Sequence, residues 1–593
     1  MISDPAMLLV SSIVGLAMGA TVALLRAVLP RWVDVAVVAV FAIGPLALIG
    51  RTPLGHTTGR TLWEWSAVGG ATVQASYHID PLAVTAASVV ALATGVALHA
   101  AARWGAGPLL AALLAVLGIV LVALVAVTDI VVATLVAGTA ATLAVAVGLF
   151  VAPAAAAARL AALLALGVEA LIAAALLLAR AGVASFDLDD LAPTMVSSGV
   201  VLAVMVAAAL FGGLYPFVPW RYERSSPGPA GSLYSGRGAA LFPTGVAATA
   251  LAFRVVAGSG QRPDQLRLPE ISIEWQALLV AIVLILAALA VRSAPRAAIR
   301  GRAVTGLVFV VAAIALPFLS LAHIMVLLAL LSIVYATVAS TALVAEWSVA
   351  RFTVRLAVLW AALASGSAPA LAAALFGLVA SSLSLAIESV ALPGAAGGAI
   401  GTSARLLNVV GPFLAVAGVA FAPDPVTGAL AGVVLAWAAL LELGHAVRES
   451  ASEGGPRLGE RGFAALVAVA AVFVVALVAS IPATGAAVDL LGSLPAEASD
   501  VVLAALSLVA VALAIVLVAL PGMITIRLSD RTLSVLGRVL AASDPVPALS
   551  LAYRGLEVWS ERIGAVFATL EDRAGVWLAT ALIALALIWA ATS

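Results

Sequence analysis

Among the ionisable residues inside or at the ends of long apolar stretches of this 593-residue chain, five are candidates for a proton or ion path. They are Glu169, His323, Glu388, Glu442 and His445. An ionisable side chain in hydrocarbon is energetically costly, so such residues are rare there and usually belong to a proton or ion path. Glu442 and His445 are three residues apart and share one helical face. These residue types indicate the passage of protons or cations through an apolar medium.

Each of these residues also has a structural interpretation. Glu169 lies in the middle of its stretch, where no structural feature requires an acid. His323 can be a cap or a hydrogen-bonded loop residue at an external end, and Glu388 can be an interfacial acid. Glu442 and His445 form either a proton uptake or release point near the cytoplasmic boundary or the solvated end of a helix. Asp129 stands at a predicted helix start, which favours an N-cap.

Other kinds of chemistry lack the residues that they need. The chain has no cysteine, which excludes disulfides, iron–sulfur clusters and thiolate zinc sites carried by it. Two neighbouring ligands, Glu442 and His445, do not make a metal site. No glycine-rich phosphate loop, nucleophile–base set or cofactor fingerprint is present. With 29 basic and 29 acidic residues, a nucleic-acid partner is not indicated. We therefore expect no cofactor and no metal in this chain, and no catalysis by the chain alone.

The composition places these residues in a lipid bilayer. Hydrophobic residues make up 64% of the chain and charged residues only 10%, against about 25% charged in soluble proteins. At about 20 to 25 residues per span, we predict an all-α polytopic membrane protein with about 14 to 16 transmembrane helices. The apolar stretches are 7–25, 33–50, 82–101, 108–127, 130–151, 160–179, 197–218, 238–256, 275–291, 303–319, 321–344, 356–391 (one or two helices), 404–422, 427–446, 463–481, 500–521 and 575–592.

The distribution of arginine gives this layout an orientation. Arginines such as Arg159, Arg292 and Arg351 concentrate in the odd-numbered connections up to the eleventh. The even-numbered connections are richer in acids, such as Asp187 and Asp189. Because basic residues favour the cytoplasmic side, we predict cytoplasmic odd connections and an external N-terminus. The expected location is a bacterial or archaeal inner membrane.

Two segments depart from a simple series of spans. The small and polar residues of 364–370 indicate a discontinuous helix or a short re-entrant turn, or else an ordinary loop between two short helices. The segment 524–574 has apolar residues at three- and four-residue spacing, which predicts an amphipathic lateral helix before a terminal anchor. The predicted organisation is N-terminal helices over 1–74, a first repeat over 75–260, a second over 261–450, C-terminal helices over 451–523, the amphipathic segment over 524–574 and the anchor over 575–593.

A family resemblance is carried by the stretch 205–254. One apolar helix there leads into a Pro-x-x-x-Trp sequence, an acidic residue, a Pro-x-Pro turn and a serine. The matching residues are Pro216, Trp220, Glu223, Pro227, Pro229 and Ser232. This pattern resembles the antiporter-like membrane subunits of respiratory complex I, of Mrp-type cation/proton antiporters and of membrane-bound hydrogenases. The Asp-x-Leu sequence at Asp80 and the placement of Asp129 before the fifth span are similar to the same family.

The resemblance implies a definite fold and mechanism. The fold consists of inverted repeats with discontinuous helices, the seventh helix being interrupted before Pro216. In the family, a glutamate on the fifth helix pairs with a lysine on the broken seventh, and histidines and lysines continue the relay. Lysine suits this task because its pKa falls in low dielectric and rises beside a carboxylate, whereas arginine holds its proton.

The residues of that relay are missing from this sequence. The family glutamate corresponds to Thr139, the broken-helix lysine to Phe211 and a histidine to Gly236. No shift of the alignment restores the lysine, since the chain contains none. An arginine-rich composition explains the loss of surface lysines but not the replacement of a mechanistic lysine by phenylalanine.

We therefore expect a membrane-arm subunit of a complex-I-like ion-translocating assembly, in company with other membrane and peripheral subunits. It is either a divergent proton or cation pathway or a structural scaffold within a possible ion-translocating oxidoreductase. The alternative is a membrane subunit that couples a cation gradient to a soluble partner enzyme, as in inorganic-carbon accumulation. A stand-alone transporter is disfavoured by the missing central charges.

Overall fold

The computed structural model describes residues 58–66, 71–103, 108–151, 154–218, 236–267, 319–342, 347–390, 399–452 and 483–491, with six single positions between 280 and 314. The chain divides into two units, one containing 1–270 and 317–537 and the other 271–316 and 538–593. Nearly all described residues belong to the first unit, and the description below concerns that unit. The predicted amphipathic segment 524–574 and the terminal anchor lie outside the described residues.

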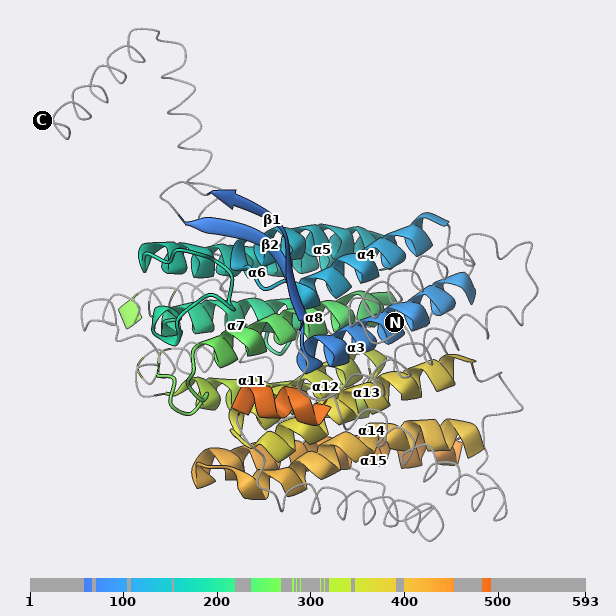
Figure 1. The fold of residues 1–593 in the computed structure, drawn as a ribbon. Helices are drawn as coiled ribbons and strands as arrows, with labels where there is room; N and C mark the ends of the chain where they lie inside the picture. Colours follow the sequence, from blue (N-terminus) through green and yellow to red (C-terminus); the bar gives the residue numbers. More distant parts are fainter. Residues whose placement is uncertain are drawn as a thin grey trace, which may run out of the picture. The chain divides into compact units, whose positions relative to one another are not determined.

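The described part of this unit is a set of helices with one β-hairpin (Figure 1). Its helices are α3 (Pro81–Arg103), α4 (Pro108–Ala126), α5 (Ile130–Val151), α6 (Ala154–Arg180), α7 (Ser198–Gly212), α8 (Gly236–Gly258), α11 (Leu321–Ala342), α12 (Trp347–Ala364), α13 (Ala368–Val390), α14 (Ala399–Gly418) and α15 (Pro425–Ser452). Single 3₁₀ turns cover Pro193–Met195 and Val419–Phe421, and a short helix covers 483–491. Six of the described helices, α3, α4, α5, α6, α13 and α15, are long and apolar enough to cross a membrane. The all-α polytopic membrane fold is thereby confirmed.

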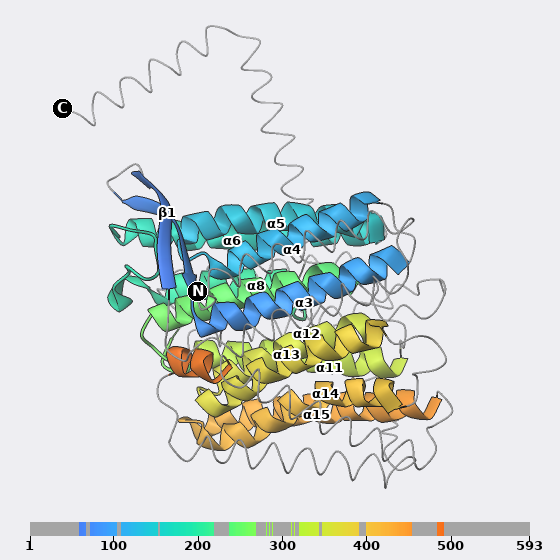
Figure 2. The ribbon, with the colours of Figure 1, turned by 45° about the vertical axis from the view of Figure 1, so that its right-hand side comes forward.

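Helices α3 and α8 form the middle of the bundle (Figure 2). Helix α8 contacts α3, α4, α5, α7 and α12, and α3 joins this half to α13. Burial is highest in the middle of the bundle and falls toward its outside: 94% of the membrane-crossing window of α3 is buried, against 33% for α6. The outward faces of α5 and α6 are therefore the peripheral surface of the unit.

The β-hairpin was not expected from the sequence. Strands β1 (Thr58–Ser66) and β2 (Thr72–Ile79) pair antiparallel, and β2 leads directly into α3. Isolated bridges join Tyr77 to Val127 and Asp129 to Asp187. The connections before α3, between α4 and α5 and between α6 and α7 thus meet at one end of the bundle, which we call the hairpin end. These are the even-numbered connections, so the predicted alternation of connections is seen in the bundle.

The segment 364–370 is an ordinary turn between two helices. Helix α12 ends at Ala364 and α13 begins at Ala368, with Gly366 between them at φ 66°. The Ser367 hydroxyl donates to the Gly418 carbonyl at 2.6 Å, so the turn is tied to the end of α14. The discontinuous-helix interpretation of this segment is wrong.

One detail of the predicted layout also needs correction. The sequence places Arg351 in a connection, but Arg351 and Arg355 both lie within α12 and both are buried. The start of α12 was missed because the helix begins nine residues before the apolar stretch 356–391. Those nine residues are more polar, so membrane hydropathy does not mark them as part of a span.

Candidate functional site

The seventh helix is interrupted where the sequence predicts. The side chain of Ser197 accepts from the Val200 N–H at the start of α7. The helix ends after only 15 residues, with Gly213 in the left-handed conformation at φ 59°. The backbone N–H of Tyr215 then donates to Ser332 Oγ at 3.0 Å. Since Ser332 is midway along α11, the interruption stands at the middle of the bundle.

A close approach of two glycines also places the interruption of α7 at the middle of the bundle. Gly212, the last residue of α7, packs on Gly245 near the middle of α8, and a Cβ at Gly245 would stand 2.6 Å from the Gly212 Cα. The rings of Tyr215 and Tyr335 stack beyond it, with centroids 5.5 Å apart. The non-helical backbone is therefore buried in protein, which is the condition under which such backbone is tolerated in a membrane.

Phe211 fills the position at which the resemblance has a lysine. Its side chain is fully buried and its ring lies over Gly167 of α6. Thr139, at the position of the family glutamate, is exposed and its hydroxyl donates to the Leu135 carbonyl at 3.0 Å within its own helix. Phe211 and Thr139 are thus in different environments, the first buried in the bundle and the second exposed. Gly236 is the first residue of α8.

A buried ion pair joins α12 and α15 in the second half. Arg351 Nε donates to Glu442 Oε2 at 3.2 Å, and the side chains are 6% and 2% exposed. The interpretation of Glu442 as part of a solvated helix end is therefore wrong. An ion pair removed from water is held by its mutual attraction, and loss of either partner leaves an uncompensated charge.

Neighbouring side chains extend this pair into a polar network. Arg355, one turn after Arg351, donates to Asn408 Oδ1 of α14 at 2.8 Å. Asn408 Nδ2 donates in turn to Ser384 Oγ of α13 at 2.9 Å. The Arg355 guanidinium also lies over the rings of Phe242 and Phe352, 5.6 and 5.4 Å from their centroids. We call Arg351, Arg355, Ser384, Asn408 and Glu442 the second-half network.

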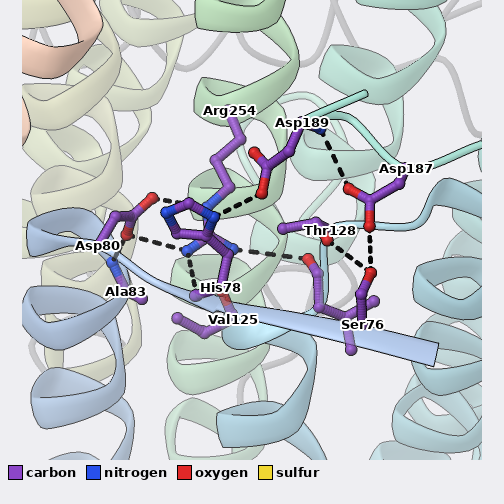
Figure 3. Close-up of polar contacts among 10 residues, drawn as sticks. Ser76, His78, Asp80, Ala83, Val125, Thr128, Asp187, Asp189 and Arg254 are labelled. Carbon is purple, nitrogen blue, oxygen red and sulfur yellow. Dashed lines mark hydrogen bonds and ion pairs between the residues drawn. The ribbon is translucent and has the colours of Figure 1, made fainter. Parts of the chain in front are cut away.

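A second polar cluster lies at the hairpin end (Figure 3). Arg254, near the end of α8, makes two parallel bonds to Asp80, from Nε at 3.0 Å and Nη2 at 2.9 Å. Asp80 also accepts the Ala83 N–H and so caps α3. Burial opposes ionisation of Asp80, but the attraction and hydrogen bonds of Arg254 lower its pKa below the ordinary value. Arg254 further donates to the Val125 carbonyl, so it ties α3, α4 and α8 together.

The hairpin itself is held to this cluster by two aspartates. His78 Nδ1 lies 2.5 Å from Asp189 Oδ2, and this hydrogen bond raises the pKa of His78 although burial opposes it. Ser76 donates to Asp187, and its hydroxyl lies 2.9 Å from that of Thr128. These contacts have a structural character, because they join the strand to the helix ends.

Asp129 is an N-cap, as expected. Its Oδ1 accepts the N–H groups of Val131 and Val132 at 2.8 and 3.0 Å, and its Oδ2 accepts the Gln74 N–H of β2 at 2.7 Å. Burial raises the pKa of Asp129, and these N–H bonds counteract that rise. Asp129 thus belongs to the attachment of the hairpin rather than to a path along the helices.

The remaining predicted residues are dispersed. Glu169 lies in α6 with its side chain exposed, and His323 Nδ1 lies 2.6 Å from Ser320 Oγ at the start of α11. His445 follows Glu442 on α15 and is partly buried. Glu388 is in α13, but its side chain is outside the described part. The family-motif residues Trp220, Glu223, Pro227, Pro229 and Ser232 also lie outside the described residues.

Metal binding finds no support in the described part of the chain, where no three histidine, cysteine or acidic residues gather as ligands.

Sequence reasoning missed Arg254 and the second-half arginines as site residues. The signal available for them was an arginine within or beside an apolar stretch, which membrane energetics marks as exceptional.

Comparison with known proteins identifies the fold. No protein-family model matches the sequence, and no curated protein matches it. Among solved structures, a chain of the Mrp complex from Dietzia sp. DQ12-45-1b is similar at a TM-score of 0.55 and 17% identity, over 99% of this chain and 63% of that one. The chain therefore spans less than two thirds of the Mrp chain whose fold it shares.

Two further solved structures give lower scores. One is respiratory complex I from Thermus thermophilus, at a TM-score of 0.46 and 18% identity over 82% of this chain and 100% of that chain. The other is an archaeal membrane-bound sulfane sulfur reductase, at 0.45 and 14% identity over 74% and 69%.

Proposed function

We propose that this chain, which has the fold of an antiporter-like membrane subunit, belongs to the membrane arm of a complex-I-like ion-translocating assembly. Its first half acts as a scaffold, and any proton path through it runs by way of Glu442 in the second half. The observation that carries this proposal is the interrupted α7, kept in its buried setting while Phe211 packs on Gly167 where the resemblance has a lysine.

The scaffold role of the first half follows from the chemistry of the side chains. A relay needs a group that releases and regains its proton as its partner moves, and phenylalanine has no such group. Phe211 is fully buried against α6, and exposed Thr139 donates to its own helix. The packing of these positions supports rigidity instead of proton exchange.

The second-half network supplies the remaining titratable chemistry. Arginine does not release its proton at any physiological pH, because its pKa is above about 12. Arg351 therefore acts as a fixed charge, and Glu442 is the member of the pair that can take up a proton. Protonation of Glu442 would break the ion pair, which gives the network two states. Arg355 and Asn408 extend the network to α14, and Ser384 extends it to α13.

The test is proton uptake by the intact assembly reconstituted into vesicles. Glu442→Gln is expected to abolish uptake that depends on this chain, while Phe211→Leu leaves uptake unchanged. The double variant Arg351→Gln with Glu442→Gln removes both charges and keeps assembly intact, so it separates loss of transport from loss of folding. Full proton uptake in the double variant would exclude a proton path through Glu442 and would leave the chain a structural scaffold only. Loss of uptake in an assembled Phe211→Leu complex would overturn the scaffold role of the first half.

A further inference from the structure

An ionisable residue stands on the outward face of the unit at membrane depth. Glu169 lies in the middle of α6 and its side chain is exposed. At 1.5 Å per residue, its position is about 16 Å along the helix from Arg180. Among the described residues no side chain bonds to it. A carboxylate at this depth is unfavourable against lipid and ordinarily faces protein or water.

Polar side chains of α5 accompany Glu169 at the same depth. Gly138 of α5 meets Val168 of α6, since a Cβ added to Gly138 would stand 3.9 Å from Val168 Cγ1. Thr139 therefore stands level with Glu169, and Thr142 follows one turn along. Both threonines are exposed, with their hydroxyls bonded back to their own helix.

The rest of this face suits a close helix–helix contact. Small residues recur along the exposed side of α6 at helical spacing, at Ala158, Ala162, Ala165 and Ala173, with exposed aliphatic side chains among them. In membranes, small residues let two helix backbones approach and polar side chains then bond across the contact. We call this surface, the exposed side of α5 and α6 around Glu169, the Glu169 face.

Helix α15, on the opposite side of the bundle from α6 (Figures 1 and 2), supplies the contrast within the same molecule. Its exposed side chains include Val426, Leu430, Val433 and Leu440. These are long aliphatic groups without an ionisable member, which is the composition that lipid chains accept. The Glu169 face also exposes aliphatic side chains, among them Leu166, Ile172 and Leu176, so the difference between the two described faces is the exposed Glu169 carboxylate.

We infer that the Glu169 face is the docking face for a transmembrane helix of a different membrane subunit, one that presents an arginine or lysine at mid-depth to Glu169. The inference rests on the proposed function, because it assumes a multisubunit assembly.

Charge complementarity excludes the chain itself as the donor of that cation. The predicted spans that lie wholly or largely outside the described residues contain no arginine, lysine or histidine: 7–25, 33–50, 275–291, 303–319, 463–481, 500–521 and 575–592. A second copy does not supply it at that depth either: Arg254, Arg351, Arg355 and Arg405 are buried, and Arg159 and Arg180 lie toward the two ends of α6. A helix from another subunit can supply the basic side chain that this chain's own spans and a second copy do not offer at that depth.

Photo-crosslinking in native membranes tests the inference directly. A photoreactive residue at Ile172 is expected to join a different membrane-embedded chain, at a span with a basic residue near its centre. The same residue at Val433 is the matched control and is expected to label lipid only. Crosslinks from Ile172 to this chain's own spans, to a second copy or to lipid alone would each overturn the inference.

Charge reversal supplies an independent readout. Glu169→Arg is expected to lower the amount of that partner recovered with the chain about tenfold, and reversal of the partner's basic residue to glutamate restores recovery. The isosteric Glu169→Gln, which keeps a hydrogen-bonding group, lowers it less. Unchanged recovery with Glu169→Arg contradicts the docking face. A chain that purifies alone from native membranes in mild detergent contradicts the proposed function instead, so the two failures are distinct.

Discussion

The ring of Phe211 on α7 lies directly over the backbone of Gly167 on α6. A Cβ at Gly167 would stand 2.6 Å from Cε2 and 2.7 Å from Cδ2 of that ring. The two residues are matched, because the aromatic ring needs the space that a missing side chain leaves. This fit holds the interrupted helix against its neighbour.

The fit predicts that Gly167→Ala destabilises the protein. The new methyl group cannot be accommodated unless the buried ring moves, and overpacking of this kind costs about 1 to 3 kcal/mol. Thermal unfolding of the detergent-purified chain measures the effect. Gly138→Ala is the matched control, since its Cβ would make only an ordinary contact at 3.9 Å. Equal melting temperatures for the two variants would show that the ring has room to yield.

Loss of Arg254 is expected to be severe at the hairpin end. Arg254→Met leaves the Asp80 carboxylate buried without its partner, which costs about 3 to 5 kcal/mol. Arg254→Lys recovers only part of this, because an ammonium cannot make the two parallel bonds seen here. The control is Arg262→Met at an exposed position, expected within about 0.5 kcal/mol of wild type. A mild effect of Arg254→Met in the same unfolding assay would exclude this role.

The contact of His78 with Asp189 predicts a pH dependence. The pKa of His78 is raised in the folded protein, so this contact stabilises fully below the unfolded pKa of about 6.5 and loses its contribution as pH rises through the folded value. Asp189 is half exposed, so solvent screening keeps the effect below about 1 kcal/mol. Melting temperatures across that range in wild type and Asp189→Asn check it. The variant should lose less stability than wild type as pH rises.

The pair of Arg351 and Glu442 should show strong coupling. Glu442→Leu leaves the Arg351 charge buried, at a cost of about 3 to 5 kcal/mol. Adding Arg351→Met removes that charge, so the double variant is expected to be more stable than Glu442→Leu alone. A double-mutant cycle on unfolding free energies should give a coupling of about 0.5 to 3 kcal/mol. Additive effects would mean that the 3.2 Å contact contributes nothing.

Several elements could be predicted because their causes are local. Two glycines and a proline within five residues stop α7 at Gly212 and Gly213, and the same signal is readable in the sequence. Asp129 before an apolar stretch predicts the N-cap that is observed. The acid-rich connections alternate with the arginine-rich ones, and the structure brings the acid-rich ones to one end.

Other features depend on distant parts of the chain. Asp80 and Arg254 are 174 residues apart in the sequence, and Arg351 and Glu442 are 91 residues apart. No local sequence pattern therefore predicts either ion pair. The hairpin at 58–79 was missed because its strands exist through their mutual pairing and their bridges to the helix ends. Isolated two-stranded hairpins have little stability of their own.

By itself, the sequence determined that this chain is a membrane protein, where its seventh helix breaks and that the broken helix carries no lysine. Only the tertiary structure decided which charges are buried together and which side of each helix faces outward. The physical reason is the solvent: lipid is as apolar as the protein interior, so a membrane helix need not differ between its two sides. Glu169 and Glu442 are alike in sequence, as single acids in apolar helices. Packing alone turns Glu169 outward and pairs Glu442 with Arg351.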